Sequence, residues 1–135
     1  METMQISKSR LWTSRIMSGL VILFMLFDGI NKLITPGEIV RVTMNQLGYA
    51  EHHLPIMGIL GIIATIFYII PRTSVLGAVL LTGYFGGAIA THVRVDNPLL
   101  SHVLFPVYLA ILMWGGLWLR DQRVRMLLLP VRKIA

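Results

Sequence analysis

The chain alternates long apolar segments with short polar ones. Four segments are almost wholly apolar, at residues 12–34, 54–70, 75–95 and 99–119. A helix needs about 20 predominantly apolar residues to cross a bilayer, and these segments are close to that length. The pattern predicts an all-α membrane protein in which residues 1–135 form one domain, a bundle of four transmembrane helices.

Residues that end or begin helices separate the last three spans. Pro71 ends the second span, and Thr73 or Ser74 is expected to cap the third. Asn97 is expected to cap the fourth span, with Pro98 at its first helical position. Both connections are therefore predicted to be short turns.

The segment between the first and second spans has a different pattern. Thr35-Pro-Gly-Glu38 has the form of a capping box with proline at the first helical position, and Gly48 is expected to end the helix. Between them the apolar residues recur at helical spacing: Ile39, Val40, Met44 and Leu47. Residues 36–47 are too few to cross a bilayer. They predict a short amphipathic surface helix that roofs the bundle.

Composition agrees with a membrane protein. The chain is 56% hydrophobic and 13% charged, with a mean hydropathy of +0.74, whereas a soluble domain carries about 25% charged residues. The net charge of +6 suggests nucleic-acid binding, but most cations lie near the ends of the apolar runs, where they contact lipid headgroups. We therefore expect the lipid bilayer, and no nucleic acid, as a partner. The lack of cysteine excludes a disulfide relay, a thiolate nucleophile and cysteine-ligated metals.

A secretory signal peptide is the alternative interpretation of the first apolar segment, because it also has a basic start and an apolar core. The segment is long, however, and no small-x-small cleavage site precedes Asp28. A retained first span is the better prediction.

The cations predict the orientation. Nine of the twelve lysines and arginines fall on one side of a four-span topology: Lys8, Arg10, Arg15, Arg72, Arg120, Arg123, Arg125, Arg132 and Lys133. Lys32, Arg41 and Arg94 fall on the other side. Since positive residues stay in the cytoplasm, we predict a multi-pass protein with both termini, including the tail at residues 120–135, in the cytoplasm.

Polar side chains gather at the opposite, outer end of the predicted bundle. Ionisable groups inside membrane segments are costly and mark candidate functional sites. The candidate pocket residues are Asp28, Asn31, Lys32, Tyr84, His92, Arg94 and His102. Asp28 and Lys32 are in the favourable i, i+4 order for an ion pair. That pair either satisfies itself or extends to His92 or Arg94 across the bundle.

The third span carries two adjacent stripes of residues. Gly83, Gly87 and Thr91 form a small-residue stripe that is expected to pack closely against another helix. Tyr84, Ala88 and His92 form the other stripe, which is a candidate pocket wall.

Pro106 lies inside the fourth predicted span. It cannot donate a hydrogen bond to the carbonyl of His102, so we expect a kink there. The kink either helps to line the pocket or is purely structural.

Other kinds of site have less support. His92, His102 and Asp28 are a possible ligand set for zinc, and the two histidines for haem, but no HxxxH or HxxE spacing accompanies them. No GxSxG or HExxH motif indicates hydrolysis. We predict no metal site, and the catalytic residues, if the chain is an enzyme at all, are unknown.

Several motifs in order resemble a known family. They are Leu26-Phe-Asp-Gly-x-x-Lys-Leu33, Pro71-Arg-Thr-Ser-Val-Leu-Gly-Ala78, Leu81-Thr-Gly-Tyr-x-Gly-Gly-Ala-x-Ala-Thr-His-Val-Arg94, His102-Val-Leu-Phe-Pro-Val-Tyr108 and Trp114-Gly-Gly-Leu-Trp-Leu-Arg120. This series resembles the DoxX-like family of small bacterial integral membrane proteins. The resemblance implies a four-helix membrane bundle in the bacterial inner membrane. It also implies a link of some relatives to quinone-dependent thiosulfate oxidation and to oxidative-stress complexes.

Three functions are compatible with the sequence. The first is binding of a lipophilic small molecule, with a quinone as the candidate cofactor, in a redox-linked membrane complex whose partner supplies the electrons. The second is a non-enzymatic scaffold or assembly subunit that contacts another membrane protein or a second copy of the chain. The third is a small proton-coupled transporter acting as an oligomer.

Overall fold

A computed structural model of the protein describes residues 6–34 and 37–129. Every regular element in these residues is helical: α1 (Lys8–Leu33), α2 (Glu38–Gln46), η1 (Glu51–His53), α3 (Leu54–Ile69), η2 (Pro71–Thr73), α4 (Ser74–Arg94), η3 (Leu99–Val103), α5 (Phe105–Arg120) and α6 (Gln122–Leu128). Four helical stretches are long and apolar enough to cross a membrane: Lys8–Leu33, Glu51–Ile69, Pro71–Arg94 and Leu99–Arg120. The predicted all-α bundle with four candidate spans is confirmed.

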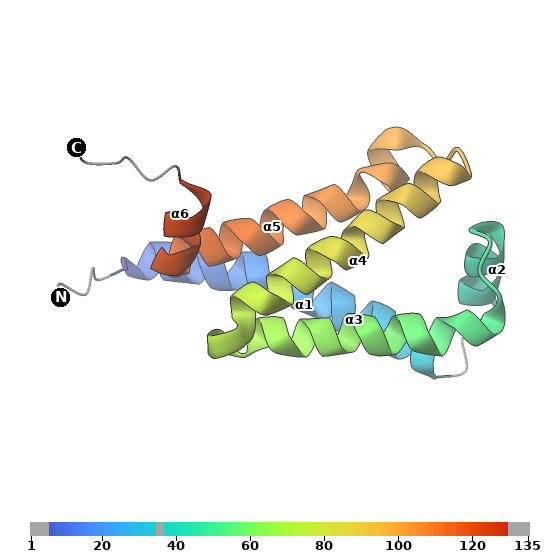
Figure 1. Ribbon diagram of the computed structural model, residues 1–135, viewed down its shortest axis with the longest axis horizontal. Coiled ribbons are helices and arrows are strands. Elements are labelled where there is room, and N and C mark those ends of the chain that lie inside the picture. Colours follow the sequence, from blue (N-terminus) through green and yellow to red (C-terminus); the bar gives the residue numbers. More distant parts are fainter. Residues whose placement is uncertain (1–5, 35–36, 130–135) are drawn as a thin grey trace.

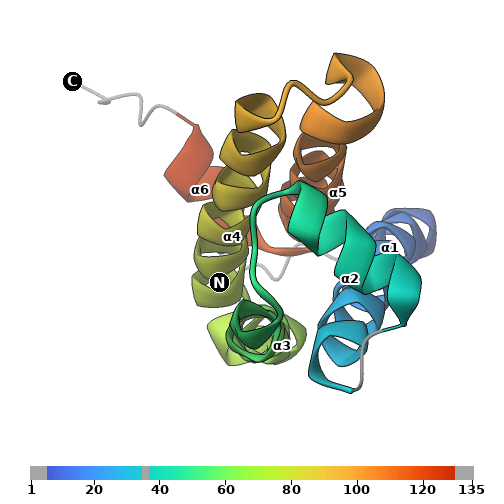
Figure 2. The same cartoon turned by 90° about the vertical axis from the view of Figure 1, so that its right-hand side faces the viewer.

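The four long helices form a bundle whose two ends differ. α1 packs against α3 and α5, and α4 packs against the same two helices, so α1 and α4 lie diagonally opposite (Figure 2). α3 and α4 meet at η2 and diverge towards the end of the bundle that carries α2 (Figure 1). We call that end the α2 end and the opposite one, where α1 begins and α6 lies, the α6 end.

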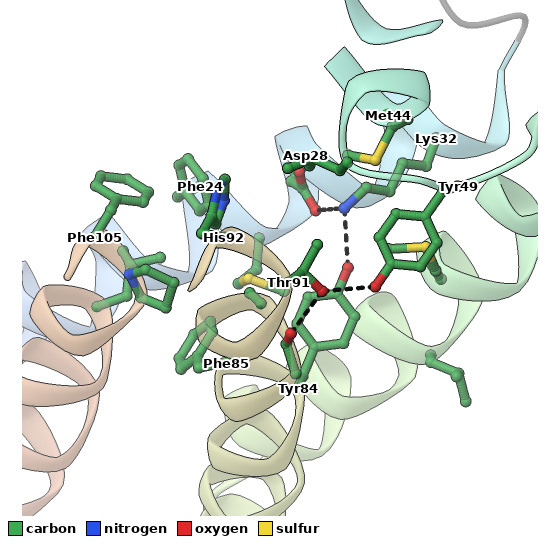
Figure 3. A pocket seen from close by; sticks show the side chains of 18 of the residues that line it. Phe24, Asp28, Lys32, Met44, Tyr49, Tyr84, Phe85, Thr91, His92 and Phe105 are labelled. Atoms are coloured by element: carbon green, nitrogen blue, oxygen red, sulfur yellow. Dashed lines mark hydrogen bonds and ion pairs between the residues drawn. The ribbon is translucent and has the colours of Figure 1, made fainter. Parts of the chain in front are cut away.

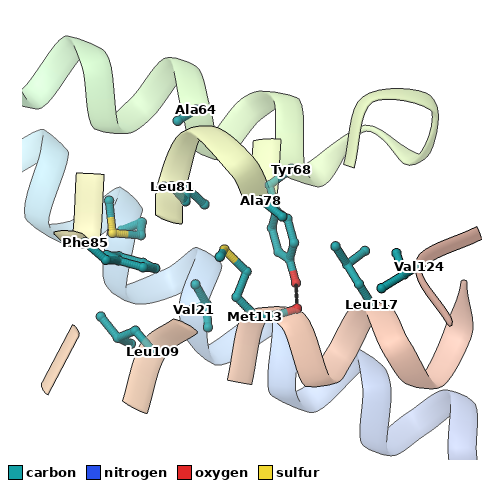
Figure 4. Packing of buried hydrophobic residues seen from close by; sticks show 11 residues of the cluster. Val21, Ala64, Tyr68, Ala78, Leu81, Phe85, Leu109, Met113, Leu117 and Val124 are labelled. Atoms are coloured by element: carbon teal, nitrogen blue, oxygen red, sulfur yellow. Dashed lines mark hydrogen bonds between the residues drawn. The ribbon is translucent and has the colours of Figure 1, made fainter. Parts of the chain in front are cut away.

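Aliphatic, aromatic and sulfur-containing side chains from all four long helices form the core (Figure 4): Val21, Met25, Ala64, Tyr68, Ala78, Leu81, Phe85, Leu109, Met113 and Leu117, with Val124 of α6. The Tyr68 hydroxyl donates to the Met113 carbonyl at 2.9 Å and lies 2.7 Å from Ser18 Oγ. Among the described residues every buried side-chain nitrogen and oxygen has a hydrogen-bond partner. Large apolar side chains such as Leu23 and Phe27 cover the outer surface, as expected for helices that face lipid.

Glycines allow close helix contact, but not where the sequence predicts it. A Cβ atom at Gly77 would collide with the backbone of Tyr68, and one at Gly58 would lie 2.8 Å from the Gly29 carbonyl oxygen. A Cβ atom at Gly83 or Gly87 would meet nothing within 4 Å. The predicted packing of the Gly83 stripe against another helix of the chain is therefore wrong, because α3 and α4 have diverged at this level.

At the C-terminal end of α2 the predicted role of Gly48 is confirmed, whereas the N-terminal end differs from the prediction. Gly48 has a φ of 88°, and the amides of Gly48 and Tyr49 bond to the carbonyls of Asn45 and Met44 at 3.0 and 2.9 Å. This is the Schellman arrangement, which glycine favours. At the other end Gly37 is the N-cap and Glu38 is the first helical residue, while Thr35 of the predicted capping box lies outside the described residues.

The fourth span begins with an interruption. Pro98, not Asn97, holds the N-cap position of η3, a π-helical turn, and the Asn97 side chain bonds to His92 instead. α5 then starts at Phe105 with Pro106 in its first turn, where a missing N–H does not disturb the helix. The expected kink at Pro106 is thus a break between two helices.

The N-cap of α4 is one of the two predicted residues. Thr73 holds the N-cap position, but its side chain makes no capping bond. Its Oγ1 donates instead to the Phe67 carbonyl at 2.8 Å, and Ser74 Oγ donates to the Tyr68 carbonyl at 2.8 Å. The two hydroxyls therefore tie the start of α4 to the end of α3.

Candidate ligand-binding site

A cavity of about 330 Å³ opens at the α2 end, between the diagonal helices α1 and α4 (Figure 3). Side chains of two helices face each other across it. α1 contributes Phe24, Met25, Asp28 and Lys32, and α4 contributes Tyr84, Phe85, Ala88, Thr91 and His92. Met57 and Leu60 of α3 and Phe105, Pro106 and Leu109 at the start of α5 line the sides. Met44 of α2, together with Leu47 and Tyr49 just after that helix, lines the end of the cavity, so α2 roofs the bundle as predicted.

Helical periodicity brings these side chains to one space. Asp28 and Lys32 are one turn apart on α1, and Tyr84, Ala88 and His92 follow one another at four-residue intervals on α4. Residues at this spacing share a helix face. The divergence of α3 from α4 leaves that face of α4 uncovered near the α2 end. Gly83 and Gly87 line the same cavity and add no side chain to fill it.

Lys32 forms the polar centre of the cavity. Its ammonium lies 2.5 Å from Asp28 Oδ2 and 2.9 Å from the Tyr84 hydroxyl. The Lys32 side chain is 5% exposed and the Asp28 side chain 26%, so the charge pair is desolvated on the lysine side. An ammonium has only donors, and the Tyr84 oxygen therefore accepts from Lys32. The Tyr84 O–H is the remaining donor of this group, and the Asp28 carboxylate is an acceptor within its reach.

His92 is the second polar group of the wall. Its Nδ1 lies 2.7 Å from the Asn97 amide nitrogen. Because the amide nitrogen is a donor, this contact places the acceptor nitrogen of the neutral ring at Nδ1 and the ring proton on Nε2. The ring also stands edge to face with that of His102, with centroids 5.7 Å apart.

The other predicted site residues lie outside this cavity. Asn31 Nδ2 donates to the Phe27 carbonyl of its own helix at 2.7 Å. Arg94 Nη2 donates to the Leu47 carbonyl at 2.9 Å and lines a second cavity between α3 and α4. His102 is exposed, with Nδ1 2.7 Å from Ser101 Oγ. The structure therefore brings Asp28, Lys32, Tyr84 and His92 into one cavity, whereas Asn31 and Arg94 lie apart and His102 touches His92 from outside the cavity.

The sequence does not identify Tyr49 as part of the site. The Tyr49 hydroxyl lies 2.8 Å from Thr91 Oγ1, and both residues line the main cavity and the second one. This hydrogen bond links the connection after α2 to α4 (Figure 3). Tyr49 lies in a loop with no periodic pattern, so only the fold reveals its position.

The aromatic side chains of the wall complete the cavity. Phe24 and Phe105 stack edge to face with ring centroids 5.0 Å apart, which closes the side between α1 and α5. Among residues 6–34 and 37–129, no three histidine, cysteine, aspartate or glutamate side chains are grouped to hold a metal ion. The arrangement offers hydrogen-bond donors and one carboxylate inside an otherwise apolar wall.

Comparison with known proteins identifies the family. A family model described as the DoxX-like family matches residues 16–116. The chain belongs to the DoxX-like family. The matched region of this DoxX-like chain contains every residue that lines the main cavity and ends before α6. No curated protein and no solved structure matches the chain.

Proposed function

We propose that this DoxX-like bundle binds a lipophilic small molecule through polar acceptor atoms on its head, with a quinone as the leading candidate. The observation that carries the proposal is the buried Lys32, whose ammonium joins Asp28 and Tyr84 at the wall of a largely apolar cavity. Cavities of this kind, apolar with a few placed polar groups, are where proteins bind small molecules.

The two donors of α4 suit a head with two acceptors. Tyr84 and His92 are eight residues apart, which corresponds to about 12 Å along a helix at about 1.5 Å per residue. Both donors reach the same cavity, so they can bond to one head that carries an acceptor on each side. A quinone, with two carbonyl oxygens on opposite sides of a six-membered ring, is such a head.

The size of the cavity limits which part of the ligand it can hold. A volume of about 330 Å³ holds a substituted ring, whereas a long hydrocarbon tail must extend towards the lipid. Asp28 pairs with the Lys32 ammonium and orients it. The chain carries no cysteine and no cofactor motif, so in a redox-linked complex a partner protein would supply the electrons.

The proposal places the protein in the bacterial inner membrane with both termini in the cytoplasm. The support is the cation count, since a four-span topology assigns nine of the twelve lysines and arginines of the sequence to the side of the termini. The cavity would then open at the outer leaflet.

Extraction of bound molecules tests the proposal. We would purify the protein in native-like lipid, extract it with organic solvent and identify the lipophilic molecules by mass spectrometry. A Tyr84→Phe, His92→Phe double variant removes both donors and keeps aromatic rings in place. Tyr108→Phe is the matched control, because the Tyr108 hydroxyl bonds to the Leu100 carbonyl at 3.0 Å and lies outside the cavity.

We expect a discrete ligand to be retained by the wild type and by Tyr108→Phe and to be lost from the double variant. Equal amounts of ordinary phospholipid alone in all three samples would contradict ligand binding. A ligand retained equally by the double variant would contradict the role of the two donors.

A scaffold function is the second candidate, supported by a different observation. Gly83, Gly86 and Gly87 expose a face of α4 on which a Cβ atom would meet nothing within 4 Å, and such faces accept another helix. Gly86 does not line the main cavity, so Gly86→Leu would break a complex with a second copy or a partner and leave the cavity open. Loss of a co-purifying assembly in Gly86→Leu, with no ligand in the wild type, would favour the scaffold.

A further inference from the structure

Three arginines converge at the C-terminal end of α5. Arg10 Nε donates to the Leu119 carbonyl at 2.7 Å, and Arg125 Nη1 donates to the carbonyls of Trp118 at 2.9 Å and Leu119 at 3.4 Å. Arg10 of α1 and Arg125 of α6 thus share one carbonyl oxygen, beside Arg120. We call these three residues the arginine cluster.

Neutral groups hold Arg120 in its place. Its Nη1 donates to Ser18 Oγ at 2.5 Å and to Ser14 Oγ at 3.1 Å, and its guanidinium lies 5.9 Å from the centre of the Tyr68 ring. Ser14 and Ser18 are 0% and 4% exposed. The fold therefore fixes this guanidinium against the bundle through hydroxyls and a ring, without a carboxylate.

No carboxylate of the described residues pairs with the arginine cluster. The described cations at the α6 end are Lys8, Arg10, Arg15, Arg72, Arg120, Arg123 and Arg125. The described acid at this end is Asp121, which pairs with Arg123 at 2.9 Å. Asp121 also attracts the neighbouring Arg120, but one carboxylate that already pairs with Arg123 leaves the three half-buried arginines with an excess of positive charge.

Capping of α5 explains only part of this arrangement. Cations are favourable at the C-terminus of a helix, where they bond to its last carbonyls. Each guanidinium has five N–H donors, however, and the hydrogen bonds described above use only one nitrogen each of Arg10, Arg120 and Arg125. The remaining donors suit an oxyanion such as a phosphate, which guanidinium groups can bind through two parallel hydrogen bonds.

Apolar side chains next to the cluster indicate what carries the anion. Val124 is fully buried and holds α6 to the core, whereas Met126, Leu127 and Leu128 are 66%, 71% and 56% exposed. On α1, Trp12 is 62% exposed. Basic groups flanked by exposed apolar side chains at the end of membrane spans match the boundary between phosphate headgroups and acyl chains.

We propose that the arginine cluster and the exposed apolar side of α6 form a binding site for an anionic phospholipid. The phosphate of the lipid accepts hydrogen bonds from Arg10, Arg120 and Arg125, and its acyl chains lie against Met126 and Leu127. The site is independent of the cavity at the α2 end and has its own ligand class.

Tryptophan quenching by brominated lipids measures this binding directly. The protein would be reconstituted into phosphatidylcholine vesicles, and brominated phosphatidylglycerol or brominated phosphatidylcholine would be titrated in, with Trp12 and Trp118 near the proposed site as reporters. The variants are Arg125→Gln and Arg10→Gln. Lys8→Gln is the matched control, because it removes one positive charge from the same end of the bundle outside the cluster.

We expect the wild type and Lys8→Gln to prefer phosphatidylglycerol, and each arginine variant to lose about fivefold of that preference, as expected for one arginine at an anionic surface. Circular dichroism establishes that the variants keep their helix content, and Arg10→Gln gives a second, independent reading if Arg125→Gln fails to fold. An equal loss in Lys8→Gln would overturn the site in favour of a diffuse field of charge. Competition by inorganic phosphate at matched ionic strength would overturn the lipid as the ligand.

Discussion

At the scale of single residues, Lys32 is the charged side chain with the most unusual surroundings. It is the only charged side chain among the described residues that is buried. A buried charge is tolerated only when it is paired and hydrogen-bonded, and Asp28 and Tyr84 meet this need. The pair thus places polarity at the cavity wall and constrains which substitutions the wall accepts.

The two partners of this ion pair should respond unequally to substitution. Asp28→Ala leaves Lys32 buried and unpaired, which should lower the free energy of unfolding by about 2–3 kcal/mol. Lys32→Met keeps the apolar stem and leaves Asp28, which is 26% exposed, in reach of water, so the loss should be about 1 kcal/mol. Unfolding of both variants in one detergent measures the difference, and the combination Asp28→Asn, Lys32→Met should recover most of it. Equal losses from both single variants would refute the asymmetry.

Asp121 predicts a pH dependence at the α6 end. Hydrogen bonds from the Arg123 side chain and backbone hold the pKa of the Asp121 carboxyl below its usual value of 3.8, and Oδ1 caps α6 by accepting from the Arg123 amide at 2.9 Å. A lowered pKa in the folded state stabilises α6 above the usual pKa, and this stabilisation is lost as the pH falls through the lowered value. A spin label at Met126→Cys, in a chain with no other cysteine, should become mobile only when the pH falls below the usual pKa of 3.8. Asp121→Asn should remove that pH dependence while keeping a side-chain oxygen at the cap.

At the scale of elements, the divergence of α3 and α4 creates the site. The two helices touch at the η2 end through Gly77 and the backbone of Tyr68, and Thr73 and Ser74 bond across the turn. Towards the α2 end they separate, and Tyr49 reaches Thr91 across the gap. One helix pair therefore supplies both a tight anchor and an open cavity wall.

Substitutions at two glycines of α4 test whether α3 and α4 are tightly packed at one end and separated at the other. Gly77→Ala places a methyl group against the α3 backbone, which cannot move aside, so we expect a loss of about 3 kcal/mol or more in unfolding free energy. Gly83→Ala meets no atom within 4 Å, and the better helix propensity of alanine should leave stability unchanged or raise it by up to about 1 kcal/mol. Thermal unfolding of both variants in the same detergent measures the contrast. A destabilised Gly83→Ala would indicate that another helix covers this face.

At the scale of the whole molecule, hydrophobic length and helical spacing predict the architecture well. The spans follow from apolar runs, and the Asp28–Lys32 pair follows from its i, i+4 spacing. The sequence cannot show where a long side chain ends: Arg94 starts at the level of the cavity but turns to the Leu47 carbonyl. A stripe of small residues likewise does not reveal whether another helix covers it. Gly77 lies against the α3 backbone, whereas Gly83 lies where α3 has diverged from α4.

The orientation of the whole fold in its membrane can be predicted from the span count and the charges. An even number of spans returns the chain to its starting side, and the described chain indeed begins and ends at the α6 end (Figure 1). Since nine of the twelve cations belong to that side, we expect it to face the cytoplasm. Asn45→Cys in α2 and Gln122→Cys in α6 are single, exposed reporters, because the natural chain has no cysteine. A membrane-impermeant thiol reagent added to spheroplasts should label Asn45→Cys at once and Gln122→Cys only after the membrane is permeabilised. The reverse pattern would invert the topology and move the cavity to the cytoplasmic leaflet, and labelling of both sites in intact cells would contradict four complete crossings.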